Sequence, residues 1–252
     1  MAAVSRRAEG RPDTSRISPV ATNFGYFGGG GPYSTVDRID YSNDTATASA
    51  KGPIGFSASY GRKQLAATGN ASFGYFGGGF SSLGGDRSDV ERVDYSNDTA
   101  TAAAKGPLSI ARKEFAATGN ASFGYFGGGG PGNGMSTVDR VDYGNDTATA
   151  SPKGPLYAGR RRLAATGNSF FGYFIAGASS GWENQIDRID YSNDTATASP
   201  KGTLSSPGKA DLAATGNADF GYVGGGKTPQ SKSTVERIDY SNDTATAVEK
   251  GP

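Results

Sequence analysis

The chain has 252 residues, and its 25 basic and 24 acidic side chains leave a formal net charge of +1, which argues against a polyelectrolyte partner such as a nucleic acid. Cysteine and histidine are both absent, so disulfides, thiolate metal sites, the commonest general base and the thiol nucleophile are excluded. No apolar run is long enough to span a membrane or to act as a secretory signal, so we expect cytoplasmic synthesis without membrane insertion.

The first residues of the chain differ in character from the rest. Residues 1–14 carry several charged side chains and almost nothing apolar, so we expect a flexible, solvated tail. From residue 15 onward one pattern recurs, and residues 65–102 are its clearest copy. Recurrence at a period of about 20 to 50 residues indicates a repeat architecture, so we expect residues 15–252 to form one domain.

Five copies of the pattern are present. The tyrosine that follows the aspartate of each copy stands at Tyr41, Tyr95, Tyr143, Tyr191 and Tyr240, a period of about 48 to 54 residues. The five units cover about 17–50, 65–104, 114–152, 163–199 and 212–249. The first and last units are in phase, so a closed ring would depend on side-chain packing between them. A closed ring is favoured over an open solenoid, because no capping segment is visible.

Each unit has four short segments that are typical of strands joined by tight turns. In the second unit, residues 65–69 are small and suit a crowded position near an axis, whereas residues 73–79 carry aromatic rings that can pack between sheets. Residues 90–95 alternate in character, as in a half-buried strand, and residues 99–102 are polar and suit an outer edge. The sequence therefore predicts an all-β fold of four-stranded antiparallel sheets.

The order of these segments resembles the kelch repeat of β-propellers. The run Tyr75-Phe-Gly-Gly is similar to the kelch hydrophobic pair before its double glycine, and Asp94 is similar to the kelch aspartate before a turn. Arginines at Arg62, Arg112 and 160–162 lie near the position of the kelch arginine before its first strand. Two features depart from the family: the last strand has alanine or threonine where kelch has tryptophan, and Tyr95 follows the aspartate instead of preceding it.

This resemblance implies a five-bladed β-propeller of four-stranded kelch-like blades, within the range of four to eight blades known for such folds. The repeated wording Asp-Tyr-Ser-Asn-Asp-Thr-Ala-Thr-Ala is also similar to repeat proteins of marine phages and bacteria. That similarity implies a component of a virion, such as a phage tail or fibre, or of a cell surface.

Three motifs invite functional readings that we set aside. The Asn-Asp-Thr turns, as at Asn43, match glycosylation acceptors and contribute aspartates such as Asp44 and Asp98, but these residues also favour hairpin turns, and one aspartate per unit is too sparse for calcium. The glycine runs are not followed by a helix, so they are turn residues instead of phosphate cradles. The arginine of each third strand has an aspartate two residues on, and this repetition predicts an ion-pair belt between sheets. These arginines are Arg38, Arg92, Arg140, Arg188 and Arg237.

The turns at one end of the predicted sheets are nearly constant, whereas those at the other end differ in every unit. The variable end gathers aromatic and basic side chains, which suit stacking on sugar rings and bidentate hydrogen bonds to acidic groups. We therefore expect a binding surface for an anionic glycan or a protein there. Its candidate residues are Tyr33, Tyr60, Arg62, Phe80, Arg112, Tyr157, Arg160, Arg161, Arg162 and Trp182.

No catalytic residue, cofactor or metal site is predicted. The first hypothesis is a non-catalytic structural or adhesion module of a virion or cell surface, which binds glycan or protein through the variable end and can assemble into a larger complex. The second is an intracellular kelch-type adaptor that presents the same end to a protein. A third is a hydrolase or lyase with an acidic site in the central channel.

Overall fold

The computed structural model describes residues 2–4, 23–30, 33–55, 61–205 and 207–252. These residues form antiparallel sheets and three short 3-10 helices, η1 (Tyr95–Asn97), η2 (Tyr191–Asn193) and η3 (Tyr240–Asn242). The all-β, antiparallel prediction is therefore confirmed. Within the described part of the chain, no helix reaches the length and apolarity that a membrane span requires.

Each repeat forms one antiparallel sheet with four main strands, which lie side by side in chain order. The first sheet contains β1 (Ala2–Val4), β2 (Phe24–Gly28), β3 (Val36–Asp40) and β4 (Ser49–Lys51). The second contains β6 (Ala66–Gly69), β7 (Phe73–Gly77), β10 (Val90–Asp94) and β11 (Ala103–Lys105). The third contains β12 (Ala116–Gly119), β13 (Phe123–Gly127), β14 (Val138–Asp142) and β15 (Ser151–Pro152).

The last two repeats have longer strands but the same order. The fourth sheet contains β16 (Ala164–Gly167), β17 (Phe171–Ala178), β18 (Trp182–Asp190) and β19 (Ser199–Thr203). The fifth contains β20 (Ala210–Gly216), β21 (Phe220–Thr228), β23 (Val235–Asp239) and β24 (Val248–Gly251), with a short extra strand β22 (Gln230–Ser231) on β21.

The described residues form six sheets, one more than the five that the sequence predicts. The additional sheet has three strands, β5 (Arg62–Lys63), β8 (Phe80–Ser81) and β9 (Gly85–Asp86). It forms because the loop between the second and third strands is long in the second repeat and folds back as a hairpin on the segment before β6. Loop variation thus creates a sheet that the repeat pattern does not encode.

The inner strand of the first sheet comes from the extreme N-terminus. Ala2 pairs with Gly28 and Val4 with Tyr26, which is the register that Ala66 and Thr68 adopt in the second sheet. The prediction of a flexible tail is therefore wrong for residues 2–4. The remainder of that tail, and residues 17–22 of the predicted first strand, lie outside the described residues.

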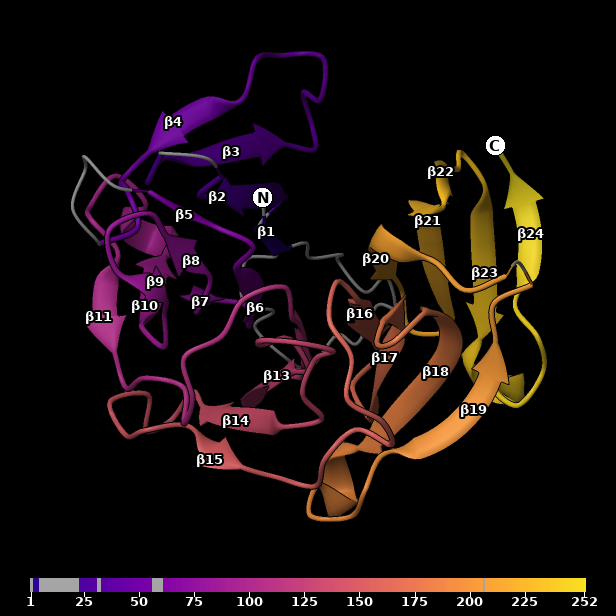
Figure 1. The fold of residues 1–252 in the computed structure, drawn as a ribbon. Helices are drawn as coiled ribbons and strands as arrows, with labels where there is room; N and C mark the ends of the chain where they lie inside the picture. The colour runs from indigo at the N-terminus through magenta and orange to yellow at the C-terminus, as the bar shows by residue number, and fades with distance from the viewer. Residues whose placement is uncertain (1, 5–22, 31–32, 56–60, 206) are drawn as a thin grey trace, which may run out of the picture.

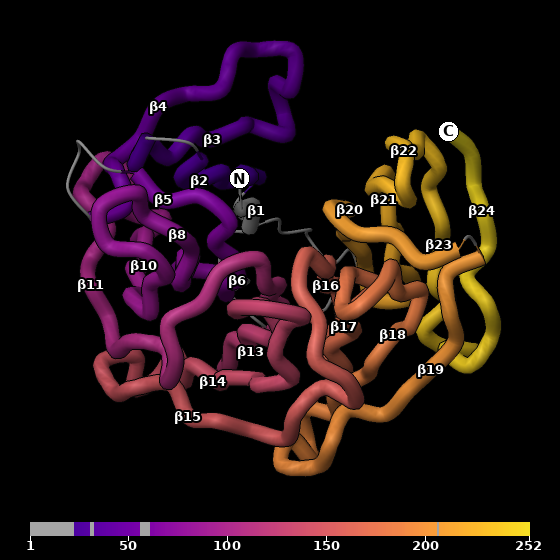
Figure 2. The backbone as a smooth tube through the Cα atoms, in the orientation of Figure 1, coloured from indigo at the N-terminus to yellow at the C-terminus, as the bar shows by residue number. Residues whose placement is uncertain are grey.

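The sheets follow one another in chain order about a common centre, with β1, β6, β16 and β20 toward the middle (Figure 1). Consecutive inner strands contact each other in the order β1, β6, β12, β16, β20. The backbone tubes of the first and fifth sheets stand apart in the same view (Figure 2). The small residues of the inner strands fit this crowded centre, as the sequence predicts.

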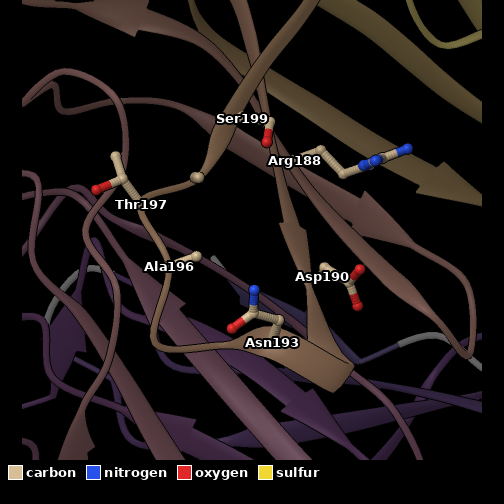
Figure 3. A pocket seen from close by; sticks show the side chains of 7 residues that line it. Arg188, Asp190, Asn193, Ala196, Thr197 and Ser199 are labelled. Atoms are coloured by element: carbon tan, nitrogen blue, oxygen red, sulfur yellow. The ribbon is translucent and has the colours of Figure 1, made fainter.

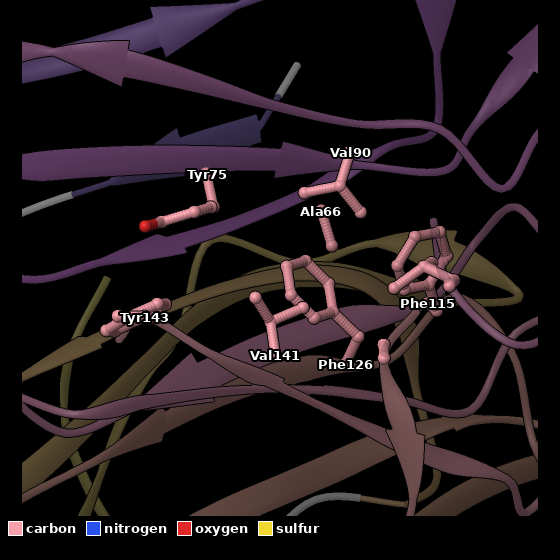
Figure 4. Packing of buried hydrophobic residues seen from close by; sticks show 9 residues of the cluster. Ala66, Tyr75, Val90, Phe115, Phe126, Val141 and Tyr143 are labelled. Carbon is pink, nitrogen blue, oxygen red and sulfur yellow. The ribbon is translucent and has the colours of Figure 1, made fainter. Parts of the chain in front are cut away.

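Aromatic side chains of the second strands fill the spaces between neighbouring sheets. Figure 4 shows one such cluster, in which Phe126 of the third sheet lies beside Ala66 and Val90 of the second, and Tyr75 stacks on Tyr143 with ring centres 4.6 Å apart. A Cβ on Gly77 would lie 2.9 Å from the Phe126 ring, so glycine at that position permits this approach. Each fully buried phenylalanine contributes about 2–3 kcal/mol of hydrophobic stabilisation.

A second contact between neighbouring sheets is polar, and we name it the inter-sheet node. Asp146, in the turn of the third sheet, accepts hydrogen bonds from Tyr75 (2.9 Å) and Arg92 (2.7 Å) and pairs with Lys105 (3.1 Å), all of the second sheet. The belt of ion pairs predicted from the arginines therefore exists, but its carboxylate is in the turn of the next sheet. The aspartate two residues after the arginine, such as Asp94, instead accepts hydrogen bonds from Ser96 and caps η1.

Candidate functional site

Three arginines that the sequence assigns to the ligand face are buried. Arg62, Arg112 and Arg160 are at most 1% exposed. Each precedes the inner strand of a repeat and pairs with an acidic residue of the third main strand of that repeat, and Lys209 takes the same place in the fifth; the pairs are Arg62–Glu91, Arg112–Asp139, Arg160–Asp187 and Lys209–Glu236. A buried, paired cation does not reach a ligand, so we reassign these arginines to the scaffold.

Burial dominates the electrostatics of these pairs. It lowers the pKa of Arg112, although Asp139 opposes the shift, and it raises the pKa of Asp187 although Arg160 opposes it. Arg112 also donates to the backbone oxygen of Phe126 at 2.9 Å and so links the loop before β12 to β13. Removing one partner of a buried pair leaves an uncompensated charge, which makes each pair important for local structure.

The remaining candidates are distributed over the variable end. Tyr33 and Tyr157 are both 63% exposed, and Trp182 is 38% exposed. Tyr60 lies outside the described residues. Within the described parts of the chain, Tyr33 and Tyr157 form no side-chain hydrogen bond or ring contact with the other candidates, so the structure does not gather all the predicted residues into one site.

Phe80 forms a small cationic cluster beside the three-stranded sheet. The ammonium groups of Lys63 and Lys113 lie 5.5 and 4.6 Å from the centre of the Phe80 ring. Lys113 also pairs with Asp86 at 2.9 Å. Both lysines come from the segments before inner strands, so this cluster borders the centre of the molecule.

A cavity of about 330 Å³ lies at the variable end, and we name it the axial cavity. It is formed by the two residues immediately before the inner strand in the second, third and fourth sheets and by two residues near the beginning of β20 in the fifth, and the inner strands lie toward the centre in Figure 1. The lining residues are Gln64, Leu65, Glu114, Phe115, Arg162, Leu163, Asp211 and Leu212. Four polar side chains therefore alternate with four apolar ones.

The polar positions of the axial cavity share an uncommon backbone conformation. Gln64, Glu114 and Arg162 each have φ of 59°, and Asp211 has φ of 58°, values that are rare for residues other than glycine. A chain of backbone hydrogen bonds accompanies this conformation, because the amide of Glu114 donates to Gln64, that of Arg162 to Glu114 and that of Asp211 to Arg162. The sheets are thus joined at the rim of the cavity, and the polar side chains line it.

The acidic groups of the axial cavity are paired. Glu114 accepts from Gln64 at 2.8 Å and from Arg161 at 3.0 Å, while Asp211 binds Arg162 and lies 3.4 Å from Lys227. Burial alone would raise the pKa of Asp211, but the bonds from Arg162 and Lys227 hold it below its ordinary value. The cavity therefore offers balanced donors and acceptors above an apolar floor, the usual composition of a small-molecule site.

The axial cavity also connects two of the predicted candidates. The guanidinium of Arg162 lies 5.8 Å from the ring centre of Trp182, a cation–π distance that extends the site outward from the cavity. The Arg161 side chain is 36% exposed and forms an ion pair with Glu114. The structure thus brings Arg161, Arg162 and Trp182 together at the variable end.

A second hollow lies at the opposite rim of the fourth sheet. It measures about 140 Å³, and Figure 3 shows Arg188, Asp190 and Asn193 on its wall, between β18 and β19. Its charged groups already have structural partners, since Arg188 binds Asp243 and Asp190 binds Ser192. We therefore regard it as the interior of a repeated hairpin.

Sequence reasoning missed Gln64, Glu114 and Asp211. A signal for them exists in the sequence. The residue before the segment Leu-Ala-Ala-Thr-Gly, which reads Phe-Ala-Ala-Thr-Gly in the third unit, differs among the second to fifth units, whereas the segment itself hardly changes. Neither the protein-family models nor the curated proteins with which the chain was compared match it.

Proposed function

We propose that the protein is a non-catalytic structural or adhesion module, built as a kelch-like β-propeller, that binds a glycan or a protein through its variable end. The observation that carries this proposal is the axial cavity, where near-identical repeats present an amide, two carboxylates and a guanidinium at one equivalent position. Loops and positions that vary on a constant scaffold are where binding specificity usually resides.

The propeller assignment is supported by the repeated sheet contacts. Four of the boundaries between consecutive repeats have the same inter-sheet node, with Asp98, Asp146, Asp194 and Asp243 as acceptors. The buried arginines before the inner strands stand where the kelch resemblance expects an arginine. On this proposal the three-stranded sheet is an elaboration of the variable end, and the four-stranded sheets are the blades.

The ligand that fits the axial cavity best is a neutral polyhydroxylated group such as a sugar. Its hydroxyls can exchange hydrogen bonds with Gln64, Glu114 and Asp211, and its apolar ring face can lie on Leu65 or Phe115. The structure gives less support to an anionic glycan than the sequence does, because Arg161 and Arg162 are paired with acidic side chains and three other candidate arginines are buried. A virion or cell-surface location remains part of the proposal.

Two alternatives differ in their chemistry. An intracellular adaptor would use the same surface for a protein partner. A hydrolase with an acidic site at the centre is disfavoured, since a general acid needs a raised pKa near neutrality, whereas that of Asp211 is lowered. We therefore propose that the site does not catalyse a reaction.

Binding of the purified chain to an array of neutral, sulfated and uronic-acid glycans tests this proposal. We expect binding to a neutral glycan that falls at least about tenfold, about 1.4 kcal/mol, in Trp182→Ala and in Arg162→Ala. Phe170→Ala is the matched control, because Phe170 is an exposed aromatic residue, 68% accessible, in a constant turn at the other end. Equal loss in all three variants would exclude the axial site, and no binding to any glycan would favour a protein partner.

A further inference from the structure

The inter-sheet node recurs with the same geometry at four boundaries between repeats. In each, a turn aspartate of one sheet accepts a hydrogen bond of 2.9 Å from a tyrosine and one of 2.7 Å from an arginine of the preceding sheet. A lysine of the preceding sheet adds an ion pair of 3.1–3.6 Å. The four acceptors are only 7–8% exposed: Asp98, Asp146, Asp194 and Asp243.

Two halves of this node remain open. Asp44, the turn aspartate of the first sheet, is exposed and has no ion pair among the described residues. At the other end of the repeat series, Tyr222, Arg237 and Lys250 of the fifth sheet occupy the donor positions, and no described carboxylate receives them. The guanidinium of Arg237 stacks on Phe220 at 4.3 Å, as the arginines of the four closed nodes stack on the equivalent phenylalanine at 4.1–4.2 Å, so Arg237 is held in the same position without the carboxylate.

Other positions on the same face of the fifth sheet also lack the neighbour that their equivalents contact in the earlier sheets. A Cβ on Gly52, Gly106 or Gly154 would lie 1.8 Å from a backbone oxygen of the next sheet, whereas one on Gly251 would meet nothing within 4 Å. Thr68, Thr118 and Thr166 are 7% exposed, and Thr68 lies 3.4 Å from a tyrosine hydroxyl of the next sheet; their equivalent Thr215 is exposed. The face therefore has the shape and the hydrogen-bonding groups of a boundary between repeats.

The two open halves are complementary in charge. The first sheet presents a carboxylate where an arginine and a lysine would bind, and the fifth presents these cations where a carboxylate would bind. Because the sheets follow one another about a common centre, the two halves lie on either side of the separation between the first and fifth sheets (Figures 1 and 2). A unit with an acceptor on one face and donors on the other would contact both halves across that separation.

We propose that these two faces are a docking site for one further copy of this repeat, a four-stranded sheet whose acidic turn binds Tyr222, Arg237 and Lys250. The tyrosine, arginine and lysine of that copy then bind Asp44. The partner is recognised by the chemistry that already joins neighbouring sheets in the chain, so specificity for a related repeat follows directly. This inference is independent of the ligand of the axial cavity.

A chain lengthened by one repeat tests the proposal. Residues 250–252 have the sequence Lys-Gly-Pro, as do residues 153–155, so a copy of residues 156–203 added after Pro252 continues the pattern in phase. We expect the lengthened chain to be monomeric and to melt in one transition at a higher Tm than the original. Asp44→Asn is expected to lower the Tm of the lengthened chain by about 4–8 °C and to leave that of the original chain unchanged.

Two further variants make the test specific. Asp194→Asn confined to the added copy is expected to remove most of the gain in Tm, and Arg237→Ala is expected to destabilise the lengthened chain more than the original. An unchanged Tm on lengthening, or a separate transition for an added copy that folds without docking, would overturn the proposal.

Measurements on the original chain can reveal a different occupant of the two faces. If Asp44→Asn or Arg237→Ala lowers the Tm of the monomeric original chain by several degrees, the first and fifth sheets bind each other and no further repeat is needed. If sedimentation shows a concentration-dependent dimer that Asp44→Asn abolishes, a second whole chain occupies the faces. Either result would replace the proposed occupant.

Discussion

Asp146 is the residue at which the reasoning about sheet association is most directly tested. The substitution Asp146→Asn keeps the size of the side chain and one acceptor oxygen but removes the charge that faces Arg92 and Lys105. Hydrogen bonds to charged groups contribute about 1.5–3 kcal/mol each, and breaking a buried ion pair costs about 3–5 kcal/mol. Arg92 is 24% exposed and part of the hydrogen bonding survives, so we expect a loss of about 2–4 kcal/mol.

Urea denaturation followed by circular dichroism measures this loss. With a slope of about 3 kcal/mol per molar urea for a chain of this size, the midpoint should fall by about 1 M. Asp44→Asn is the matched control, because it makes the same change in the same turn where the aspartate is exposed. We expect that control to change stability by less than about 0.5 kcal/mol.

Two results would contradict the stabilising role of the inter-sheet node. A midpoint for Asp146→Asn within 0.2 M of the original would mean, as an order-of-magnitude limit, that the node contributes little to folding. A shift for Asp44→Asn as large as that for Asp146→Asn would mean that the turn itself, and not the contact between sheets, depends on the aspartate.

Three further predictions concern other contacts of the scaffold. Gly154→Ala should unfold or strongly destabilise the chain, because its Cβ would lie 1.8 Å from a backbone oxygen of the next sheet. Gly251→Ala has open space around its Cβ and is limited only by its φ of +139°, so its Tm should fall less than that of Gly154→Ala. Asp139→Ala should cost about 3–5 kcal/mol, since it leaves the buried Arg112 without its carboxylate, and a urea midpoint equal to that of the original chain would contradict this. Hydrogen bonds from its neighbours hold the pKa of Asp146 below its ordinary value, although burial opposes this shift. The stability that Asp146 contributes is therefore present above the unfolded pKa of about 4 and is lost as pH falls through the folded pKa. Between about pH 4 and pH 2 the free energy of unfolding of Asp146→Asn should fall less steeply than that of the original chain.

The strands and their roles were predictable because each role has a compositional reason. Small residues occur where inner strands crowd together, and aromatic residues occur where sheets face each other, so Ala66 and Phe76 could be placed from the sequence. The arginine belt was also predictable from its repetition. Its partner was not, because the carboxylate of Asp98 comes from the turn of another unit, and only the spatial order of the sheets brings it to Arg38.

The N-terminal strand shows how a short strand is hidden by its surroundings. Residues 2–4 read Ala-Ala-Val and precede a charged segment, which suggests a tail. Aligned with Ala66, Ala67 and Thr68, the same three residues are a copy of the inner-strand pattern. The repeat therefore contained the information, but the long interval before Phe24 separated this strand from the rest of its unit.

The candidate site illustrates a different limit. Side-chain type alone assigned Arg160, Arg161 and Arg162 to one ligand surface, yet Arg160 is buried in an ion pair while Arg162 lines the axial cavity. The difference arises from the backbone: Arg162 has a positive φ, and its amide donates to Glu114. Consecutive residues of one type thus serve the scaffold and the site separately, and only the register of the inner strands distinguishes them.

This separation also explains how the repeat can vary without loss of the fold. The buried cation, the node aspartate and the aromatic strand bind neighbouring sheets and hardly change between units. The position occupied by Gln64, Glu114, Arg162 and Asp211 is joined to its neighbours by backbone hydrogen bonds that do not depend on residue type, and its side chains differ between units while they pair with one another. A scaffold of this kind presents an amide, two carboxylates and a guanidinium from four of its sheets at one shared cavity, so the chemistry of the cavity can change while the fold stays constant.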